Sequence, residues 1–393
     1  MSHLLIQIVA WMIALAWLYK LLETARGLPT VPDLQRPEFD AAPAGNPWLA
    51  VIVPARNEAA NIAACLESLL GQDYARLRIV GVDDRSSDAT GEIMDKLAAA
   101  NPGRIEALHI AELPTGWLGK THAMAVAARE AMAEYDPEYL LFTDADVIFR
   151  ADAIRRSVAQ AVTSNADHFV LMPTLTVKTA GEAMVLSYLQ VMGLWAVRPW
   201  RVADARAKRD AIGVGAFNLV RAAAYQQVGG FDAAPMEILE DLYLGRRIKR
   251  AGLRQRVAIG PGMVSVHWAA GAMGIVRGLT KNLYAVFRFR WWLLLAAAAG
   301  IALVSIAPVL FAALPGTRLA ALLALASAAG LYGYSARVSR IPGYYAVFLP
   351  VAAAMIVFAM VRSMLVMARD GGVTWRGTFY PLAELRIERR APD

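Results

Sequence analysis

The sequence predicts an α/β domain carried between apolar helices that are long enough to cross a membrane. Hydrophobic residues make up 57% of the 393 residues and charged residues 19%, against about 45–50% and 25% in average soluble chains. The apolar excess is concentrated at the two ends of the chain. Between them, short apolar runs alternate with amphipathic segments, a pattern typical of a doubly wound parallel sheet.

Composition also excludes several classes of protein. So much apolar surface excludes a disordered chain. The 29 glycines and 19 prolines are too few for a collagen-like or low-complexity chain. A single cysteine, Cys65, excludes a disulfide framework and a cysteine-built zinc site within one chain.

The first apolar run is Leu4–Leu22, in which Gln7 and Lys20 are the polar exceptions. It is long enough to cross about 30 Å of hydrocarbon as a helix. A cleaved signal peptide is the alternative. No Lys or Arg precedes the run and no small-x-small site follows promptly, so we expect an uncleaved anchor.

Three further apolar runs follow position 290, and the middle one is short enough for a re-entrant or tilted helix. They are Trp291–Leu314, Leu319–Ser335 and Tyr344–Val361. The predicted organisation is an anchor at 1–24, a proline-rich linker at 25–47, an α/β domain at 48–268, an interfacial amphipathic helix at 269–290, transmembrane helices at 291–369 and a tail at 370–393.

Charge predicts the orientation of the chain in a membrane. Between Asp241 and Asp370 there is no Asp or Glu, but there are fifteen Lys or Arg. A basic flank beside a bilayer favours the cytoplasmic side. We therefore expect a multi-pass protein of the inner membrane with a cytoplasmic α/β domain.

The same arithmetic predicts an external tail, because one anchor and three crossings leave both ends outside. The basic residues of the tail favour the inside instead. They are Arg376, Arg386, Arg389 and Arg390. An internal tail would require that one run, Leu319–Ser335 above all, does not cross.

Within the α/β domain the pattern predicts strands and helices in alternation. The expected strands are Leu49–Pro54, Arg78–Val82, Ile105–Ile110, Tyr139–Thr143, His168–Leu175 and Ala211–Val220. The expected helices are Ala59–Leu70, Asp88–Ala100, His122–Ala133, Gly181–Val197 and Met236–Ala251. After them, Gly274–Arg290 mixes apolar and basic residues, the composition of a helix lying in the membrane interface.

Two carboxylates, Asp144 and Asp146, directly follow the apolar strand at 139–143. At a strand end both can offer oxygens to one divalent cation, Mg²⁺ or Mn²⁺, and its bound diphosphate. The alternative is a helix cap, with Asp146 or Asp152 starting the next helix. His267 is a candidate further metal ligand, although a lone histidine after a strand is more often structural.

A second pair, Asp83 and Asp84, ends the strand at 78–82 and can accept hydrogen bonds from a base or a ribose. The alternative is a turn in which Ser87 or Asp88 caps the following helix. Lys120 lies in a glycine-bounded segment at a predicted helix start, which suits a phosphate.

The pair Glu240 and Asp241 is the acidic cluster of the later half of the chain. Acids in the first turn of a helix are also stabilised by the helix dipole without any function. A positioned carboxylate can act as the general base that activates an alcohol. Adjacent helix residues point about 100° apart, so only one of the two should face the reacting centre.

Together these motifs resemble glycosyltransferase family 2 with the GT-A fold, a Rossmann-like nucleotide-diphospho-sugar transferase domain. The resemblance covers residues 48–268 and rests on the order of its motifs. They are Val53-Pro-Ala-Arg-Asn-Glu58, Val82-Asp-Asp84, Thr143-Asp-Ala-Asp146, Val228-Gly-Gly-Phe-Asp232 and Glu240-Asp241. Gly119-Lys120, the apolar helices and Trp375-Arg-Gly-Thr-Phe-Tyr380 look like membrane members that glycosylate lipids, such as ceramide glucosyltransferases and bacterial hopanoid or carotenoid glycosyltransferases.

The resemblance implies roles for single residues. Pro54, Arg56, Glu58 and Asp84 would border the nucleotide, Asp144 and Asp146 would hold the metal-diphosphate, and Asp241 would be the base. Arg290-Trp291 is what remains of the family's Gln/Arg-x-x-Arg-Trp motif, with Phe287 at its first position. That departure disfavours a processive polysaccharide synthase. In the tail, Thr378 replaces the arginine of Trp-x-Gly-Arg-x-Tyr.

The predicted function is an inverting transfer of a sugar from a nucleotide-diphospho-sugar to a hydroxyl of a membrane lipid, with no nucleic-acid partner. A polyprenyl-phosphate or polysaccharide glycosyltransferase is the alternative. A nucleotidyltransferase would need a glycine-rich loop after the first strand, and here that loop is Pro-Ala-Arg-Asn-Glu. A non-catalytic membrane scaffold has no need for carboxylates at three separate element ends.

Overall fold

The structure, a computed structural model, describes residues 2–387 and divides the chain into two compact units. The helical unit comprises residues 1–30, 175–200 and 268–373, and the α/β unit comprises residues 31–174, 201–267 and 374–393. The segment 175–200, which lies inside the α/β domain predicted from sequence, thus groups with the apolar helices. Arg389 and Arg390 of the tail lie outside the described residues.

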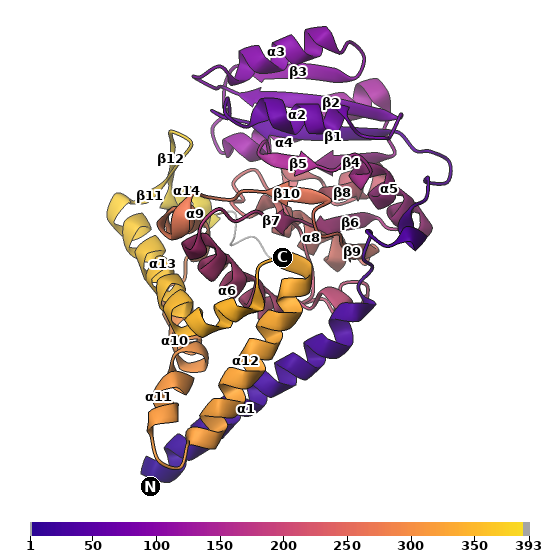
Figure 1. Cartoon of the computed structure of the whole chain (residues 1–393). Helices are drawn as coiled ribbons and strands as arrows, with labels where there is room; N and C mark the ends of the chain where they lie inside the picture. Colours follow the sequence, from indigo (N-terminus) through magenta and orange to yellow (C-terminus); the bar gives the residue numbers. More distant parts are fainter. Residues whose placement is uncertain (1, 388–393) are drawn as a thin grey trace. The chain divides into compact units, whose positions relative to one another are not determined.

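A seven-stranded sheet in the order β3-β2-β1-β4-β8-β6-β9 forms the centre of the α/β unit (Figure 1). Its strands are β1 (Leu49–Ala55), β2 (Leu77–Asp84), β3 (Ile105–Ile110), β4 (Tyr139–Phe142), β6 (His168–Met172), β8 (Asn218–Arg221) and β9 (Gln255–Ile259). All residues of β1 and β4 are buried, as expected for strands covered on both faces.

The prediction of parallel pairing is confirmed for the first four strands of the large sheet, and one later strand departs from it. β1 to β4 run parallel, but β8 is antiparallel to both of its neighbours, β4 and β6. Two consecutive parallel strands need a crossover connection, usually a helix packed on the sheet. The helix between β6 and β8 belongs to the other unit instead. The predicted strand at 211–220 is also shorter, because only its end forms β8.

Helices and a small second sheet complete the α/β unit. The helices are α2 (Ile62–Leu70), α3 (Thr90–Ala100), α4 (Gly119–Tyr135), α5 (Ala153–Thr163), α7 (Ala222–Gln227), α8 (Glu240–Arg250) and α14 (Leu382–Ile387). In the small sheet, β10 (Val264–Val266) pairs antiparallel with β5 (Val147–Phe149) and neighbours β7 (Thr174–Leu175). The core between α4 and the large sheet is apolar, with Ile52, Val82 and Phe142 fully or almost fully buried.

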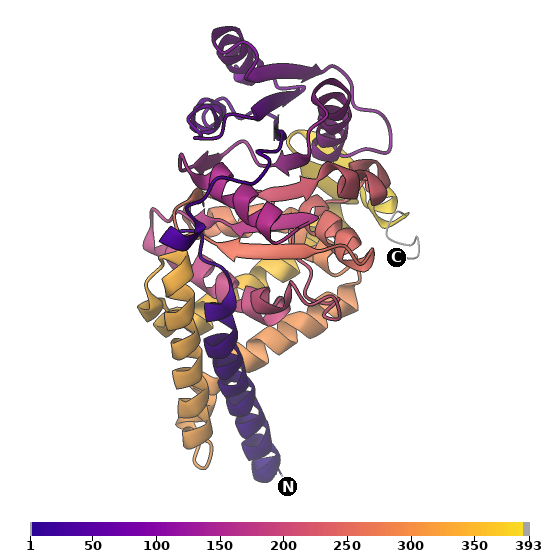
Figure 2. The ribbon, with the colours of Figure 1, turned by 90° about the vertical axis from the view of Figure 1, so that its right-hand side faces the viewer.

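The helical unit consists of long apolar helices. They are α1 (Ser2–Gly27), α6 (Ala180–Ala196), α9 (Gly271–Val286), α10 (Trp291–Ser305), α11 (Ala307–Ala313), α12 (Arg318–Ser339) and α13 (Leu349–Asp370). α1 and α12 run side by side in both views (Figures 1 and 2). α9 packs on α13, where the Ser363 hydroxyl donates to the Thr280 carbonyl at 2.5 Å and accepts from the Tyr284 N–H at 3.0 Å.

Five helical stretches of the described residues are long and apolar enough to cross a membrane. They are His3–Thr30, Ala180–Arg201, Trp291–Ala313, Arg318–Ser339 and Gly343–Asp370. Four of them overlap the four apolar runs seen in the sequence. The second, around α6, was not expected to be a candidate span.

The tail returns to the α/β unit as a hairpin of β11 (Gly372–Trp375) and β12 (Thr378–Pro381). The Arg376 side chain pairs with Glu58, and the Tyr380 hydroxyl accepts a hydrogen bond from the Gly119 N–H at 3.1 Å. Residues that touch within one folded unit lie on one side of a membrane. These contacts favour a tail on the same side as the α/β domain, and the side of the tail stays a prediction.

Candidate active site

The candidate site lies at the carboxyl ends of the parallel strands. The chain continues from β1 to Glu58 and from β4 to Asp144, and Asp84 ends β2. Because these strands are parallel neighbours, their ends meet at one edge of the sheet, which is where ligands bind in open α/β sheets. A pocket at this edge is lined by Lys120, Met124, Phe142, Thr143, Asp144, Gly215, Asn218, Phe231, Glu240 and Asp241.

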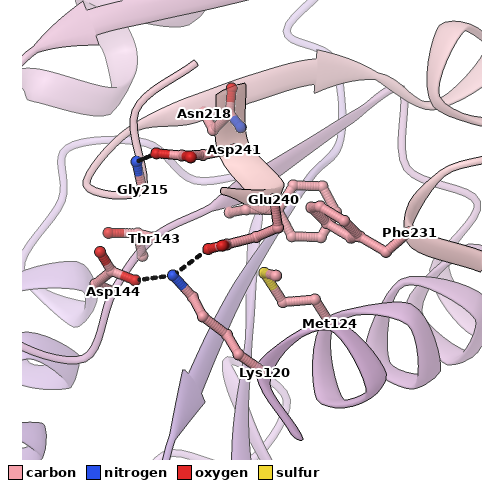
Figure 3. Close-up of a pocket in the computed structure, with 10 residues that line it drawn as sticks. Lys120, Met124, Thr143, Asp144, Gly215, Asn218, Phe231, Glu240 and Asp241 are labelled. Atoms are coloured by element: carbon pink, nitrogen blue, oxygen red, sulfur yellow. Dashed lines mark hydrogen bonds and ion pairs between the residues drawn. The ribbon is translucent and has the colours of Figure 1, made fainter. Parts of the chain in front are cut away.

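Lys120 connects two predicted acidic motifs across this pocket (Figure 3). Its ammonium lies 2.6 Å from Asp144 Oδ1 and 2.5 Å from Glu240 Oε1. Burial alone would lower the pKa of this lysine, but the carboxylates of Asp144 and Glu240 raise it above its ordinary value. Lys120 therefore stays charged, and its ammonium group connects the end of β4 to the start of α8.

Asp241 points in a different direction from Glu240, toward the loop before β8 (Figure 3). Its Oδ2 accepts the Gly215 N–H at 2.8 Å, and its Oδ1 accepts the Leu242 N–H at 2.7 Å. Desolvation and the charge of Glu240 raise the pKa of Asp241 to about 7. A carboxylate with such a pKa can exchange a proton near neutral pH.

Gly215 joins the two halves of the pocket through its backbone. Its N–H binds Asp241, and its carbonyl accepts the Asp144 N–H at 3.1 Å. A Cβ at this position would lie 2.6 Å from Asp144 Oδ2, closer than real Cβ contacts allow. Only glycine lets the backbone approach both carboxylates, and sequence reasoning missed this residue because no motif marks it.

Asp146 lies beside Asp144 in a negatively charged environment. Desolvation, then the charges of Asp144 and Glu58, raise its pKa to about 6. α5 begins at Ala153, so Asp146 does not cap that helix. Two neighbouring carboxylates suit a hard divalent cation, which would take its remaining oxygen ligands from water or phosphate.

The described residues contain no group of three or more His, Cys, Asp or Glu side chains that could hold a metal ion by themselves. Asp144, Asp146 and His267 thus do not form a complete set of protein ligands. A cation at the aspartates would depend on oxygens from a bound ligand. The metal role of His267 remains a prediction.

The loops after β1 and β2 are tied to each other. Asn57 has a positive φ of 54°, its side-chain oxygen accepts the Ser87 N–H at 2.8 Å, and its own N–H donates to Ser86 Oγ at 3.0 Å. Non-glycine residues with positive φ persist where surrounding contacts hold them, often at ligand sites. Sequence reasoning gave Asn57 no role, because its conformation is not visible in the motif.

Guanidinium groups surround Asp84 in these loops. Arg85 Nε donates to Asp84 Oδ1 at 2.8 Å, and Arg56 Nη1 lies 3.8 Å from Asp84 Oδ2. Arg56 Nε and Arg85 Nη2 are buried and donate to no described residue. Buried unsatisfied donors cost about 1–3 kcal/mol each, so an anionic ligand that accepts from them would be stabilised here.

The remaining predicted residues have structural settings that do not define their roles. Pro54 is buried within β1. Asp83 accepts the Ser86 N–H at 3.1 Å and lies 3.3 Å from His109 Nδ1. Arg290 and Trp291 belong to the helical unit, at the start of α10.

Three comparisons with known proteins agree on the kind of domain. Residues 50–216 match the family model Glycosyl transferase family 2. The 4,4'-diaponeurosporenoate glycosyltransferase of Staphylococcus haemolyticus is 24% identical over 262 residues, which are 60% of each chain. Glycosyltransferase GlyG of Streptococcus pneumoniae serotype 4 is 29% identical over 119 residues, 30% of this chain and 36% of that one. The chain thus spans 60% or less of the length of these curated relatives.

A solved structure gives the same answer for the fold. The mannosyltransferase PcManGT from Pyrobaculum calidifontis, in complex with GDP-Man and Mn²⁺, aligns with a TM-score of 0.55 at 21% identity. The alignment covers 90% of this chain and 99% of that one. The fold is therefore of the GT-A kind that the sequence predicted, with apolar helices on both sides of the domain in the chain.

Proposed function

We propose that this chain, whose residues 50–216 form a glycosyl transferase family 2 domain, is an inverting glycosyltransferase that acts on a membrane lipid. One observation carries the proposal. A pocket at the carboxyl edge of the sheet contains the Asp241 carboxyl, held by the N–H groups of Gly215 and Leu242, together with the Lys120 ammonium, which bridges Asp144 and Glu240. A base and a charged diphosphate site in one pocket are what sugar transfer requires.

The donor in this proposal is a nucleotide-diphospho-sugar at the loops after β1 and β2. The carboxylates Asp83 and Asp84 suit the base or ribose, and the unsatisfied N–H groups of Arg56 and Arg85 suit phosphate oxygens. A mannosyltransferase with a similar fold is known in complex with GDP-Man, which supports this donor class.

A divalent cation, Mg²⁺ or Mn²⁺, would be held by Asp144 and Asp146, with His267 as a predicted further ligand. When bound, the cation would balance the charge that develops on the departing diphosphate. Lys120 contributes a fixed positive charge beside Asp144, and it keeps that carboxylate oriented.

Asp241 is the proposed general base. The attacking hydroxyl must lose its proton as the sugar–phosphate bond breaks, and a carboxylate with a pKa near 7 accepts that proton without a large cost. The N–H groups of Gly215 and Leu242 fix its orientation. A single displacement at the anomeric carbon inverts its configuration.

The acceptor is proposed to be a lipid hydroxyl, on a sphingolipid-, hopanoid- or carotenoid-like molecule, at the cytoplasmic face of the inner membrane. Five stretches of the described chain are apolar enough to cross a bilayer. On α9, Arg277 is exposed while Ile275, Val276 and Leu279 are buried, so this helix offers a basic face to anionic headgroups. A relative that glycosylates a carotenoid acid, by its name, supports a lipid class of acceptor.

The proposal is tested with the full chain in lipid nanodiscs. UDP- and GDP-sugars are supplied with Mn²⁺ and a membrane lipid extract, and glycosylated lipids and released nucleoside diphosphate are measured by mass spectrometry. We expect both products in equal amounts, and neither from the Asp241→Asn variant. Release of inorganic pyrophosphate, or no product from any donor, would contradict a glycosyltransferase.

A further inference from the structure

The hairpin at the end of the chain has an unusual turn. Its two central residues, Arg376 and Gly377, have positive φ angles of 49° and 80°. Such two-residue turns favour Asn or Asp before Gly, because most side chains are strained in this region. A strained arginine persists only where its surroundings hold it, and such positions cluster at ligand sites.

Two contacts hold the hairpin on the loops of the candidate donor site. The Arg376 guanidinium pairs with the carboxylate of Glu58, which lies in the loop after β1. The Tyr380 hydroxyl accepts a hydrogen bond from the Gly119 N–H. Gly119 directly precedes Lys120, whose ammonium lies 2.6 Å from Asp144 Oδ1. The hairpin therefore reaches the neighbourhood of the proposed metal-diphosphate site.

Gly119 lies directly before Lys120 and is packed against the other donor loop. A Cβ at Gly119 would lie 2.2 Å from Asp84 Oδ2 and 2.9 Å from Arg85 Nη2. The Tyr380 hydroxyl thus binds a backbone position at which the start of α4 meets the loop after β2. Anchoring here fixes the hairpin relative to both Lys120 and Asp84.

The Arg376 side chain keeps donors for a ligand. It is 48% exposed, and the Glu58 contact uses one of its nitrogens, Nη2. A guanidinium has five N–H groups in a planar fork that matches phosphate oxygens. Arg56 Nε and Arg85 Nη2, in the loops after β1 and β2, are also unsatisfied, so the loops that the hairpin adjoins carry two further guanidinium groups with N–H donors to offer.

We propose that the hairpin Gly372–Pro381 completes the donor site and that Arg376 binds the diphosphate of the nucleotide sugar. This inference rests on the proposed function. The family match ends at residue 216, so this part of the site comes from outside the matched domain. Glu58 acts as a positioning residue that holds the guanidinium, and Tyr380 anchors the hairpin.

The test is calorimetric titration of the full chain in nanodiscs, with Mn²⁺, using UDP, GDP and the corresponding nucleosides as probes. For whichever diphosphate binds, Arg376→Ala should weaken binding at least tenfold, about 1.4 kcal/mol, and leave nucleoside affinity unchanged. Arg376→Lys should recover part of the loss, because it restores the charge without the fork. The matched control is Arg369→Ala, since Arg369 is exposed and pairs with its neighbour Asp370.

Each other outcome has a distinct meaning. Nucleoside diphosphate binding that is equal in Arg376→Ala and in the native protein would overturn this inference and leave the proposed function intact. Equal loss for diphosphate and nucleoside would overturn it too, because the variant would then have damaged the whole site. If the native protein bound neither UDP nor GDP, the proposed function itself would fail.

Discussion

Replacing Asp241 with asparagine tests the chemistry most directly. General bases contribute about 10²–10⁴-fold to rates, so turnover of Asp241→Asn should fall by about 10²-fold or more, which is about 2.7 kcal/mol or more. Donor binding should persist, because Asp144, Asp146 and Lys120 are unchanged. The products of the native enzyme should have inverted anomeric configuration.

The pH dependence follows from the raised pKa of Asp241. Burial and the neighbouring charge of Glu240 raise the pKa of Asp241 to about 7. Below pH 7 the rate should fall about tenfold per unit, because the base is protonated, and above pH 7 it should level off. Glu240→Gln removes a charge that raises this pKa, so its profile should move to lower pH with a milder loss of turnover.

The raised pKa of Asp241 also makes the stability of the fold depend on pH. The folded protein favours protonated Asp241, so this group stabilises the fold below about pH 4 and loses that contribution as pH rises through about 7. Asp241→Asn escapes the loss and should melt at least as high as the native protein at pH 8. The control is Asp73→Asn, an exposed partner of Arg155 at 2.8 Å. Near-normal turnover in Asp241→Asn, or retained configuration, would refute the reasoning.

Four further predictions follow. Excess EDTA should abolish transfer, and Asp146→Asn should lose both donor affinity and turnover; full activity in EDTA would remove the metal from the proposal. Joint replacement of Arg277 and Lys281 on α9, and of Arg288 just after it, by glutamine should lower transfer to lipid and leave nucleoside diphosphate binding unchanged, whereas unchanged lipid transfer would contradict an acceptor role for this segment. Asp95 and Asp83 raise the pKa of His109, so the contribution of the charged imidazole to stability should be present at low pH and lost as the pH rises through this raised pKa. A pH–melting curve that is unaltered in His109→Gln would contradict this. A C-terminal tag and an epitope in the α/β unit should be digested by protease in the same vesicle orientation, and opposite responses would show that the tail lies across the membrane.

The sequence predicted the elements that hold the site better than it predicted how they are connected. The strand Ile105–Ile110 was predicted with its observed bounds although only its two end residues are buried, because a short run that lies between turn residues is typical of a strand. The direction of β8 was not predicted. A strand has the same hydrophobic pattern in both directions, and the reversal depends on where the chain goes between β6 and β8.

Candidate residues were found where chemistry and local pattern coincide, as for Asp144 and Asp241. Their partners could not be found this way. Lys120 bridges Asp144 and Glu240. This contact joins segments 120 residues apart, and no local spacing in the sequence indicates it. Gly215 acts through its backbone, so its identity carries no chemical signal in the sequence.

The tail and α6 together constrain how the chain can cross a membrane. Residues 174 and 201 both belong to the α/β unit, so the stretch Ala180–Arg201 leaves that unit and returns to it. One helix that crossed fully would put its two flanks on opposite sides, so an α/β unit on one side of a membrane requires that this stretch does not cross alone, although its composition qualifies it. Residues 267 and 374 are also both in the α/β unit, which requires an even number of crossings between them. If the α/β unit lies on one side of a membrane, either none or two of the three apolar stretches between residues 267 and 374 cross it fully.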